Sequence, residues 1–97
     1  MLAAKIPNNE YGRLQKLKGY QVLDTSAEKE YDDITKLASF ICETPIALIS
    51  LVDKDRQWFK SKIGLSVNET KRSDSFCQYT IMGDDVFVIE DTHENDL

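Results

Sequence analysis

An α+β fold is predicted, with two helices followed by an antiparallel sheet that is built around a hairpin. Three observations support this prediction. Apolar residues recur at helical spacing in two segments within residues 10–42. A short apolar run, Ile46–Val52, is followed by four charged residues and a second strand-like segment. A short helix-like segment and the β-branched run Val86–Ile89 come after it.

The composition is that of one soluble domain. The chain has 97 residues, of which 41% are hydrophobic and 30% charged. Its formal net charge of −5 argues against nucleic-acid partners and anionic membranes, which need clustered Lys and Arg. The longest apolar run is well below the roughly 18 residues of a membrane span. No signal-peptide core is visible at the N-terminus, so a cytoplasmic location is expected.

The residues that most often bind metals or form disulfides are few. Two cysteines occur, Cys42 and Cys77, and in a cytoplasmic chain we expect both to be reduced thiols. His93 is the single histidine. No metal cluster is therefore expected, and no cofactor can be named from the residues.

A flexible tail is predicted for residues 1–9, followed by a helical layer over residues 10–42. Asn8 or Asn9 can cap the first helix, which Gly19 ends. Ser26 can cap the second helix, and Pro45 prevents its continuation. The second helix carries one apolar stripe, formed by Tyr31, Ile34, Leu37, Ala38 and Ile41.

The sheet and a short pocket-side helix are predicted within residues 46–92. Ile46–Val52 is apolar on both faces, so we expect it to be a buried strand with cover on each side. The strand after the charged loop carries Lys60 and Lys62 and is expected to be more peripheral. A loop over residues 65–73, a short helix over 76–82 and a strand at Val86–Ile89 complete the prediction. The expected core consists of Ile34, Leu37, Ile41, Leu48, Ile49, Leu51 and Phe59.

The chain resembles the GAF domain, in particular the type at the N-terminus of bacterial sensor histidine kinases and diguanylate cyclases. The matching segments come in family order between about Tyr11 and Thr92. Each is weak by itself, and the ordered set carries the resemblance. They are Arg13-Leu14, Tyr20–Thr25, Glu30–Thr35, Pro45–Asp53, Arg56–Ser61, Ile63–Leu65, Glu69-Thr70, Arg72, Ser75–Cys77 and Ile89–Thr92.

The resemblance implies a six-stranded antiparallel sheet with helices on one face and a small-molecule pocket on the other. The chain stops after the third predicted strand, so residues 1–97 are expected to be a partial GAF domain. An output domain such as a kinase or cyclase is implied in the full-length protein. Candidate ligand-binding residues are Phe59, Lys60, Arg72, Ser75, Phe76 and Cys77.

Cys77 also raises the question of covalent chemistry, because some GAF relatives attach a bilin through a cysteine. Those relatives usually carry a histidine beside the cysteine, whereas Gln78 follows here. The alternative is a small, mostly buried thiol on the helix that closes the pocket. We expect no catalytic activity, because no nucleophile pairs with a base.

Two functions remain open. One is a small-molecule sensory module that controls an attached output domain. The other is a ligand-free dimerisation module that transmits signals through its helices. Trp58 and Phe59 must face opposite sides of their strand, and the sequence does not say which faces the pocket. The strand Ile46–Val52 is expected to have a bare edge, which predicts self-association as a homodimer.

Overall fold

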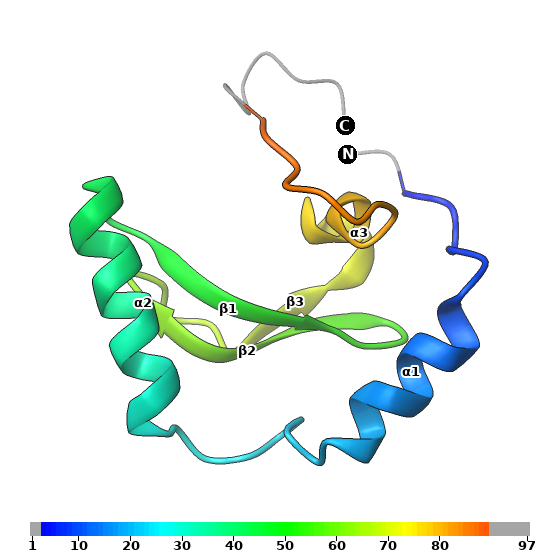
Figure 1. The fold of residues 1–97 in the computed structure, drawn as a ribbon, viewed down its shortest axis with the longest axis horizontal. Coiled ribbons are helices and arrows are strands. Elements are labelled where there is room, and N and C mark those ends of the chain that lie inside the picture. The colour runs from blue at the N-terminus through cyan, green and yellow to red at the C-terminus, as the bar shows by residue number, and fades with distance from the viewer. Residues whose placement is uncertain (1–2, 90–97) are drawn as a thin grey trace.

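The computed structural model describes residues 3–89 and has the predicted α+β fold (Figure 1). Within that part of the chain, no helix is long and apolar enough to cross a membrane. The elements, in chain order, are α1 (Glu10–Gly19), α2 (Lys29–Cys42), β1 (Ala47–Val52), β2 (Arg56–Ile63), β3 (Glu69–Lys71), a 3-10 turn (Arg72–Asp74) and α3 (Cys77–Thr80).

The sheet is antiparallel with the order β1-β2-β3, so β2 is its central strand. This corrects the prediction that the second strand is peripheral and the first is the buried one. The prediction failed because it did not include β3. This strand pairs with Arg56–Trp58 and lies within the segment that was predicted to be a loop. Because β3 has three polar residues and no apolar alternation, no periodic signal marks it in the sequence.

A β-bulge interrupts the pairing of β1 with β2. Ile49 faces Ser61 and Ser50 faces Phe59, which leaves Lys60 as the extra residue. The side chains of Lys60 and Ser61 therefore both reach the helical face, where they contact residues 25–35. By alternation along the strand, Trp58 lies on the same face as Lys60, and Phe59 lies on the opposite face.

Helix α2 packs on β1 and β2 through a polar contact (Figure 1). Thr35 is 2% exposed, and its Oγ1 lies 2.8 Å from Ser61 Oγ. Ile34, Leu37 and Ile41, which were predicted to be core residues, are instead 58%, 57% and 67% exposed. They lie roughly 100° or more around the helix from Thr35, so the face that meets the sheet is not the apolar one.

Among residues 3–89, the large apolar side chains that are buried are Val52, Trp58 and Phe59. The predicted core residues on β1 (Leu48, Ile49 and Leu51) are half-buried, because β1 forms one edge of the sheet. Among the predicted core, Phe59 alone is buried. The apolar core is therefore centred on β2.

The segments at the two ends of the described chain also differ from prediction. Residues 3–9 contact α3, since the Ala4 amide donates to Gln78 Oε1 at 2.8 Å and Pro7 is buried. Val86–Ile89 is not a strand, because the path of the chain takes it away from the sheet edges (Figure 1). Val86 and Val88 are 89% and 72% exposed. Residues 90–92 of the predicted sheet region, and His93, lie outside the described residues.

The predicted N-cap position of α1, Asn9, and its last residue, Gly19, are confirmed, whereas the prediction that Ser26 caps α2 was wrong. Asn9 and Glu28 occupy the N-cap positions of α1 and α2, and neither forms a side-chain capping hydrogen bond. Ser26 lies before α2, where its carbonyl oxygen accepts a hydrogen bond from Lys60 Nζ at 2.7 Å. Ser26 therefore contributes a backbone contact to Lys60, and Glu28 takes the N-cap position of α2.

Candidate functional site

The six candidate ligand-binding residues are divided between the two faces of the sheet. Phe59 lies on the face that α3 covers, and the thiol of Cys77 in α3 lies near Ser50, the residue opposite Phe59. Phe76, half-buried, is the N-cap of α3. We call the area formed by Phe59, Ser50, Phe76 and Cys77 the α3 face. Lys60 lies on the other side of the sheet, so the structure does not bring all six together.

Cys77 is half-buried on the α3 face. Burial raises the pKa of its thiol, and a hydrogen bond with Ser50 opposes this rise in part. The protonated thiol therefore prevails at neutral pH. Since the thiolate is the reactive form of cysteine, this environment favours a packing or hydrogen-bonding role over nucleophilic attachment of a chromophore.

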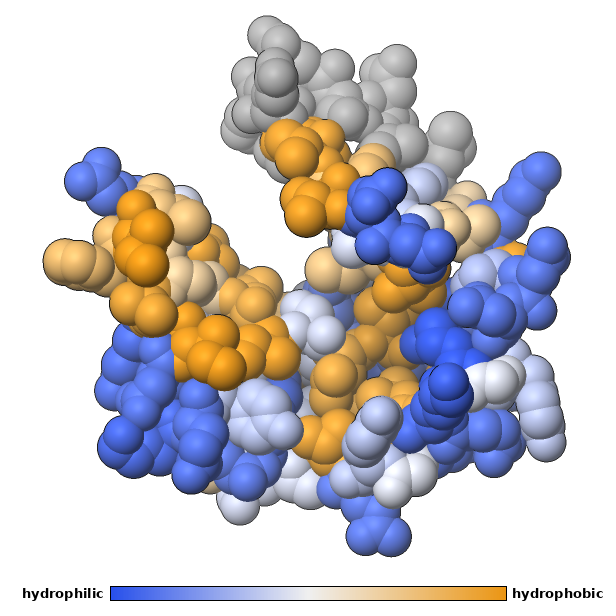
Figure 2. Space-filling view, viewed as in Figure 1, coloured by the Kyte–Doolittle hydropathy of each residue, from blue (hydrophilic) through white to orange (hydrophobic). Residues whose placement is uncertain are grey.

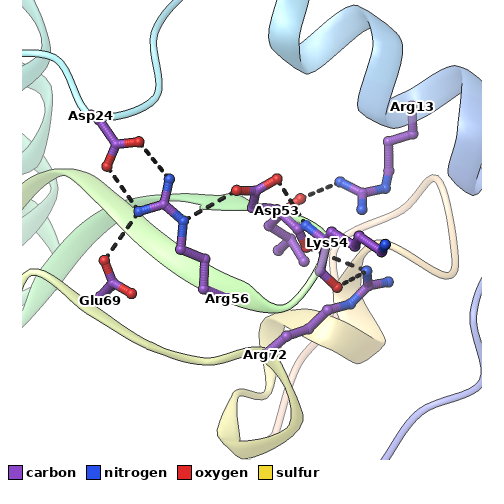
Figure 3. Close-up of polar contacts among 8 residues, drawn as sticks. Arg13, Asp24, Asp53, Lys54, Arg56, Glu69 and Arg72 are labelled. Atoms are coloured by element: carbon purple, nitrogen blue, oxygen red, sulfur yellow. Dashed lines mark hydrogen bonds and ion pairs between the residues drawn. The ribbon is translucent and has the colours of Figure 1, made fainter.

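Arg72 lies at the rim of the α3 face and is 6% exposed. Its Nη1 binds Glu10 Oε2 at 2.5 Å. The same Nη1 donates to the carbonyl oxygens of Asp53 and Lys54 at 3.3 and 3.2 Å (Figure 3). The hydrogen bond from Arg72 is the main reason why the pKa of the Glu10 carboxyl lies below its usual value. Arg72 thus ties α1 to the β1–β2 turn. Ser75, buried, donates to the Arg72 carbonyl oxygen at 2.8 Å.

A second arginine holds the other side of the same turn. Arg56 binds Asp24, Asp53 and Glu69 at 2.6, 3.1 and 3.0 Å (Figure 3). Its pKa is raised, chiefly by the hydrogen bonds with Asp24. This cluster joins the linker before α2, the turn and β3. Sequence reasoning missed it, because the partners are up to 32 residues apart and no local pattern marks them.

Lys60 is a buried cation on the helical face, with a fully buried side chain. Its Nζ lies 2.7 Å from Thr25 Oγ1, from the Ser26 carbonyl oxygen and from Glu28 Oε2. The ammonium group also lies 5.4 Å from the centroid of the Tyr31 ring. It borders a cleft of about 550 Å³ between α2 and β2 that contains both basic and acidic side chains. Because its hydrogen bonds are satisfied within the chain, Lys60 anchors the linker to the sheet.

A larger groove, of about 730 Å³, follows the outer edge of β1. Arg13 crosses it and donates from Nη1 to the carbonyl oxygen of Val52 (Figure 3). Apolar and aromatic side chains line it from α1, α2, β1 and the C-caps of α1 and α3, and they include Leu17, Tyr20, Tyr31, Ile49, Leu51 and Ile81. The sequence did not predict this groove, because it depends on β1 being an edge strand.

Among residues 3–89, no group of three or more His, Cys, Asp and Glu side chains is placed to hold a metal ion. The role of the six candidate residues in binding a ligand stays a prediction. What the structure adds is their arrangement: Phe59, Ser75, Phe76 and Cys77 belong to the side of the sheet covered by α3, and Arg72 connects that side to α1.

No family model matches the chain. A similar protein is a cyclic di-GMP phosphodiesterase from Pseudomonas aeruginosa, which is 38% identical over 91 residues. The match covers 94% of this chain and 16% of that relative. This likeness fits a role in cyclic di-GMP signalling.

The relative corrects one expectation. The sequence predicted no enzymatic activity, whereas the matched protein is named as an enzyme. The prediction rested on the absence of a nucleophile paired with a base in these 97 residues. A search for a nucleophile and a base in one segment cannot exclude catalysis by a protein in which the matching segment covers 16% of the length.

Proposed function

We propose that the chain is a GAF-type sensory module of a cyclic di-GMP signalling protein, where it regulates an attached catalytic part. The observation that carries this proposal is the similarity to one segment of a cyclic di-GMP phosphodiesterase. A segment that covers 16% of such a protein is short relative to the whole, as expected for a regulatory module.

The α3 face is the proposed position of the ligand. It combines the buried ring of Phe59 with the hydroxyl group of Ser50 and the thiol group of Cys77. An apolar surface with a few polar groups is the usual chemistry of a small-molecule site. A ligand there would contact α3 and its N-cap, Phe76.

A path for the signal leads from this face to α1. Ser75, just before α3, hydrogen-bonds Arg72, and Arg72 binds Glu10 in the first turn of α1. Helix α1 has no buried residue of its own, so these polar contacts are important for its position. A ligand that moves α3 would therefore act on α1 through Arg72.

Thermal unfolding of the chain with cyclic di-GMP, GMP and cyclic GMP as separate probes tests the ligand site. A binding probe should raise the Tm, because it stabilises the folded state by mass action. Cys77→Phe should abolish the rise by filling the α3 face. Cys42→Phe is the matched control, because Cys42 is exposed on α2, and it should keep the rise.

A probe-induced rise in Tm that survives in Cys77→Phe would contradict the proposed position. Cys77→Ser keeps the size of the side chain and should keep the rise in Tm. Loss of the rise in Cys77→Phe, but not in Cys77→Ser, then reports a filled site and not the loss of the thiol. In the longer protein that carries this segment, the same probe should change the rate of cyclic di-GMP hydrolysis, and Cys77→Phe should remove that change. A rate of cyclic di-GMP hydrolysis that neither the probe nor Cys77→Phe changes would refute regulation through this face.

A further inference from the structure

The segment before α1 is bound to α3, although the two are far apart in the chain. The Ala4 amide donates to Gln78 Oε1 at 2.8 Å across a separation of 74 positions. Pro7, three residues after Ala4, is buried. Figure 1 shows residues 3–9 passing beside α3 before α1 begins. We call residues 3–9 the N-terminal strap.

Gln78 connects the strap to two other segments through its side chain. The residue is 3% exposed, and its Nε2 donates to the Ser73 carbonyl oxygen at 2.9 Å. One carboxamide therefore joins the strap, α3 and the 3-10 turn. A buried amide group is costly unless its donor and its acceptor have partners. Loss of the Ala4 amide donor would remove one of these contacts and would weaken the hold on α3.

Helix α3 depends on such contacts because it is short. It has four residues, Cys77–Thr80, and isolated helices of fewer than about 12 residues are marginal in water. It contacts β1 and the 3-10 turn. Figure 2 shows apolar surface that runs from the region of α3 onto the sheet. Movement of α3 away from the sheet would therefore expose the half-buried Cys77 and the ring of Phe59.

The strap continues directly into α1. The Pro7 carbonyl oxygen accepts a hydrogen bond from the Glu10 amide at 3.1 Å, and the Asn9 carbonyl oxygen accepts one from the Arg13 amide at 2.9 Å. Pro7 also restricts the backbone at this point. Helix α1 has no buried residue, so it can move without exposing a buried side chain of its own. A displacement of α1 would thus act on the strap.

The strap adds a direct contact with α3 to the ion pair that already holds α1. Arg72 binds Glu10 in the first turn of α1, and its carbonyl oxygen accepts a hydrogen bond from Ser75, just before α3. The strap begins at the same turn and reaches α3 itself, through Gln78. The start of α1 and the whole of α3 are therefore connected by two separate sets of contacts.

We propose that the N-terminal strap controls access to the α3 face, because it holds α3 against the sheet through Gln78. With the strap bound, α3 covers the face. With the strap released, α3 moves and the face opens. A movement of α1 that favours one state changes access to the face. A ligand on the α3 face would in turn shift the strap, and this last step alone rests on the proposed function.

Chemical labelling of Cys77 tests the strap without a ligand. In a Cys42→Ser background, Cys77 is the remaining thiol of the 97-residue chain. Ala4→Pro removes the amide that donates to Gln78 and should speed the reaction of Cys77 with iodoacetamide at least about fivefold, because labelling follows the population of the open state. Ala3→Pro, one residue earlier at an exposed position, keeps that amide and should leave the rate unchanged.

Hydrogen exchange separates the opening of α3 from a loss of the whole fold. Ala4→Pro should speed exchange at the amides of residues 79–82, whose hydrogen bonds close α3 and its C-cap. The amides that pair β1 with β2 should keep their protection. Gln78→Ala should have the same effect as Ala4→Pro. Thr80→Ala, at an exposed position of the same helix, is the matched control and should leave exchange unchanged.

The outcomes distinguish the strap from the ligand site. Faster labelling and faster exchange confined to α3 would support the strap. Unchanged labelling and exchange in Ala4→Pro would overturn it, and so would faster exchange that extends to β1 and β2, since this would report unfolding of the domain. Neither measurement uses a ligand. A failure of every probe to raise the Tm would therefore refute the ligand site and not the strap.

Discussion

Replacing Lys60 by Met should destabilise the fold by about 2–3 kcal/mol. The change removes the ammonium group and keeps most of the length of the side chain. The lost contacts are three charge-assisted interactions at 2.7 Å and the contact with the Tyr31 ring. Taken singly, hydrogen bonds to a charged group are worth about 1.5–3 kcal/mol.

Two effects reduce that sum. Burying an ammonium group costs several kcal/mol, and the Met variant avoids this cost. Glu28 and Thr25 are exposed, so they regain water when Lys60 is lost. The net estimate is therefore about 2–3 kcal/mol, and not the full sum of the contacts.

Lys62→Met is the matched control. It lies two residues along β2, and its Nζ binds the Ser66 and Val67 carbonyl oxygens and Asn68 at the exposed surface. Its loss should cost less than about 1 kcal/mol. Urea denaturation of both variants provides the measurement. Equal losses, or a neutral Lys60→Met, would show that the buried anchor does not hold the linker.

Three further predictions follow from single residues. Gly64→Ala should cost at least about 2 kcal/mol in urea melts, because Gly64 has φ +79° and a Cβ there would lie 2.0 Å from the Pro45 carbonyl oxygen, whereas Gly83→Ala, with no atom within 4 Å, should be nearly neutral. The stability contributed by the Glu10 carboxyl is present above its unfolded pKa and is lost as the pH falls through the lower folded pKa, so Glu10→Gln should flatten the acid limb of a stability–pH curve. The raised pKa of Cys77 has the opposite sense: stability should fall as the pH rises past the unfolded thiol pKa of about 8.5, and Cys77→Ser should remove that decline.

The sequence predicted the order of α1, α2, β1, β2 and α3, because each except the last has a clear period or a strong stop signal. Pro45 separates α2 from β1, and the charged residues after Val52 mark the turn. Those signals are local. The strand order is not local, and it depended on β3, whose three residues carry no apolar pattern. The prediction of which strand was central therefore failed.

The site was harder to predict for the same reason. Simple alternation placed Trp58 and Phe59 on opposite faces of β2, but it could not reveal the bulge that turns Ser61 to the same side as Lys60. The apolar stripe of α2 was identified correctly, but the assumption that it is buried against the sheet was wrong. The helix meets the sheet through Thr35 and Ser61, so polar complementarity set its rotation.

Polar anchors thus position the whole N-terminal half on the sheet. Glu10 and Arg13 hold α1 to the β1–β2 turn, Lys60 holds the linker, and Thr35 holds α2. Such contacts are directional, so they fix orientation without covering apolar area. Within the part of the chain that the structure describes, Ile34, Leu37 and Ile41 of α2 therefore stay exposed while Thr35 meets the sheet.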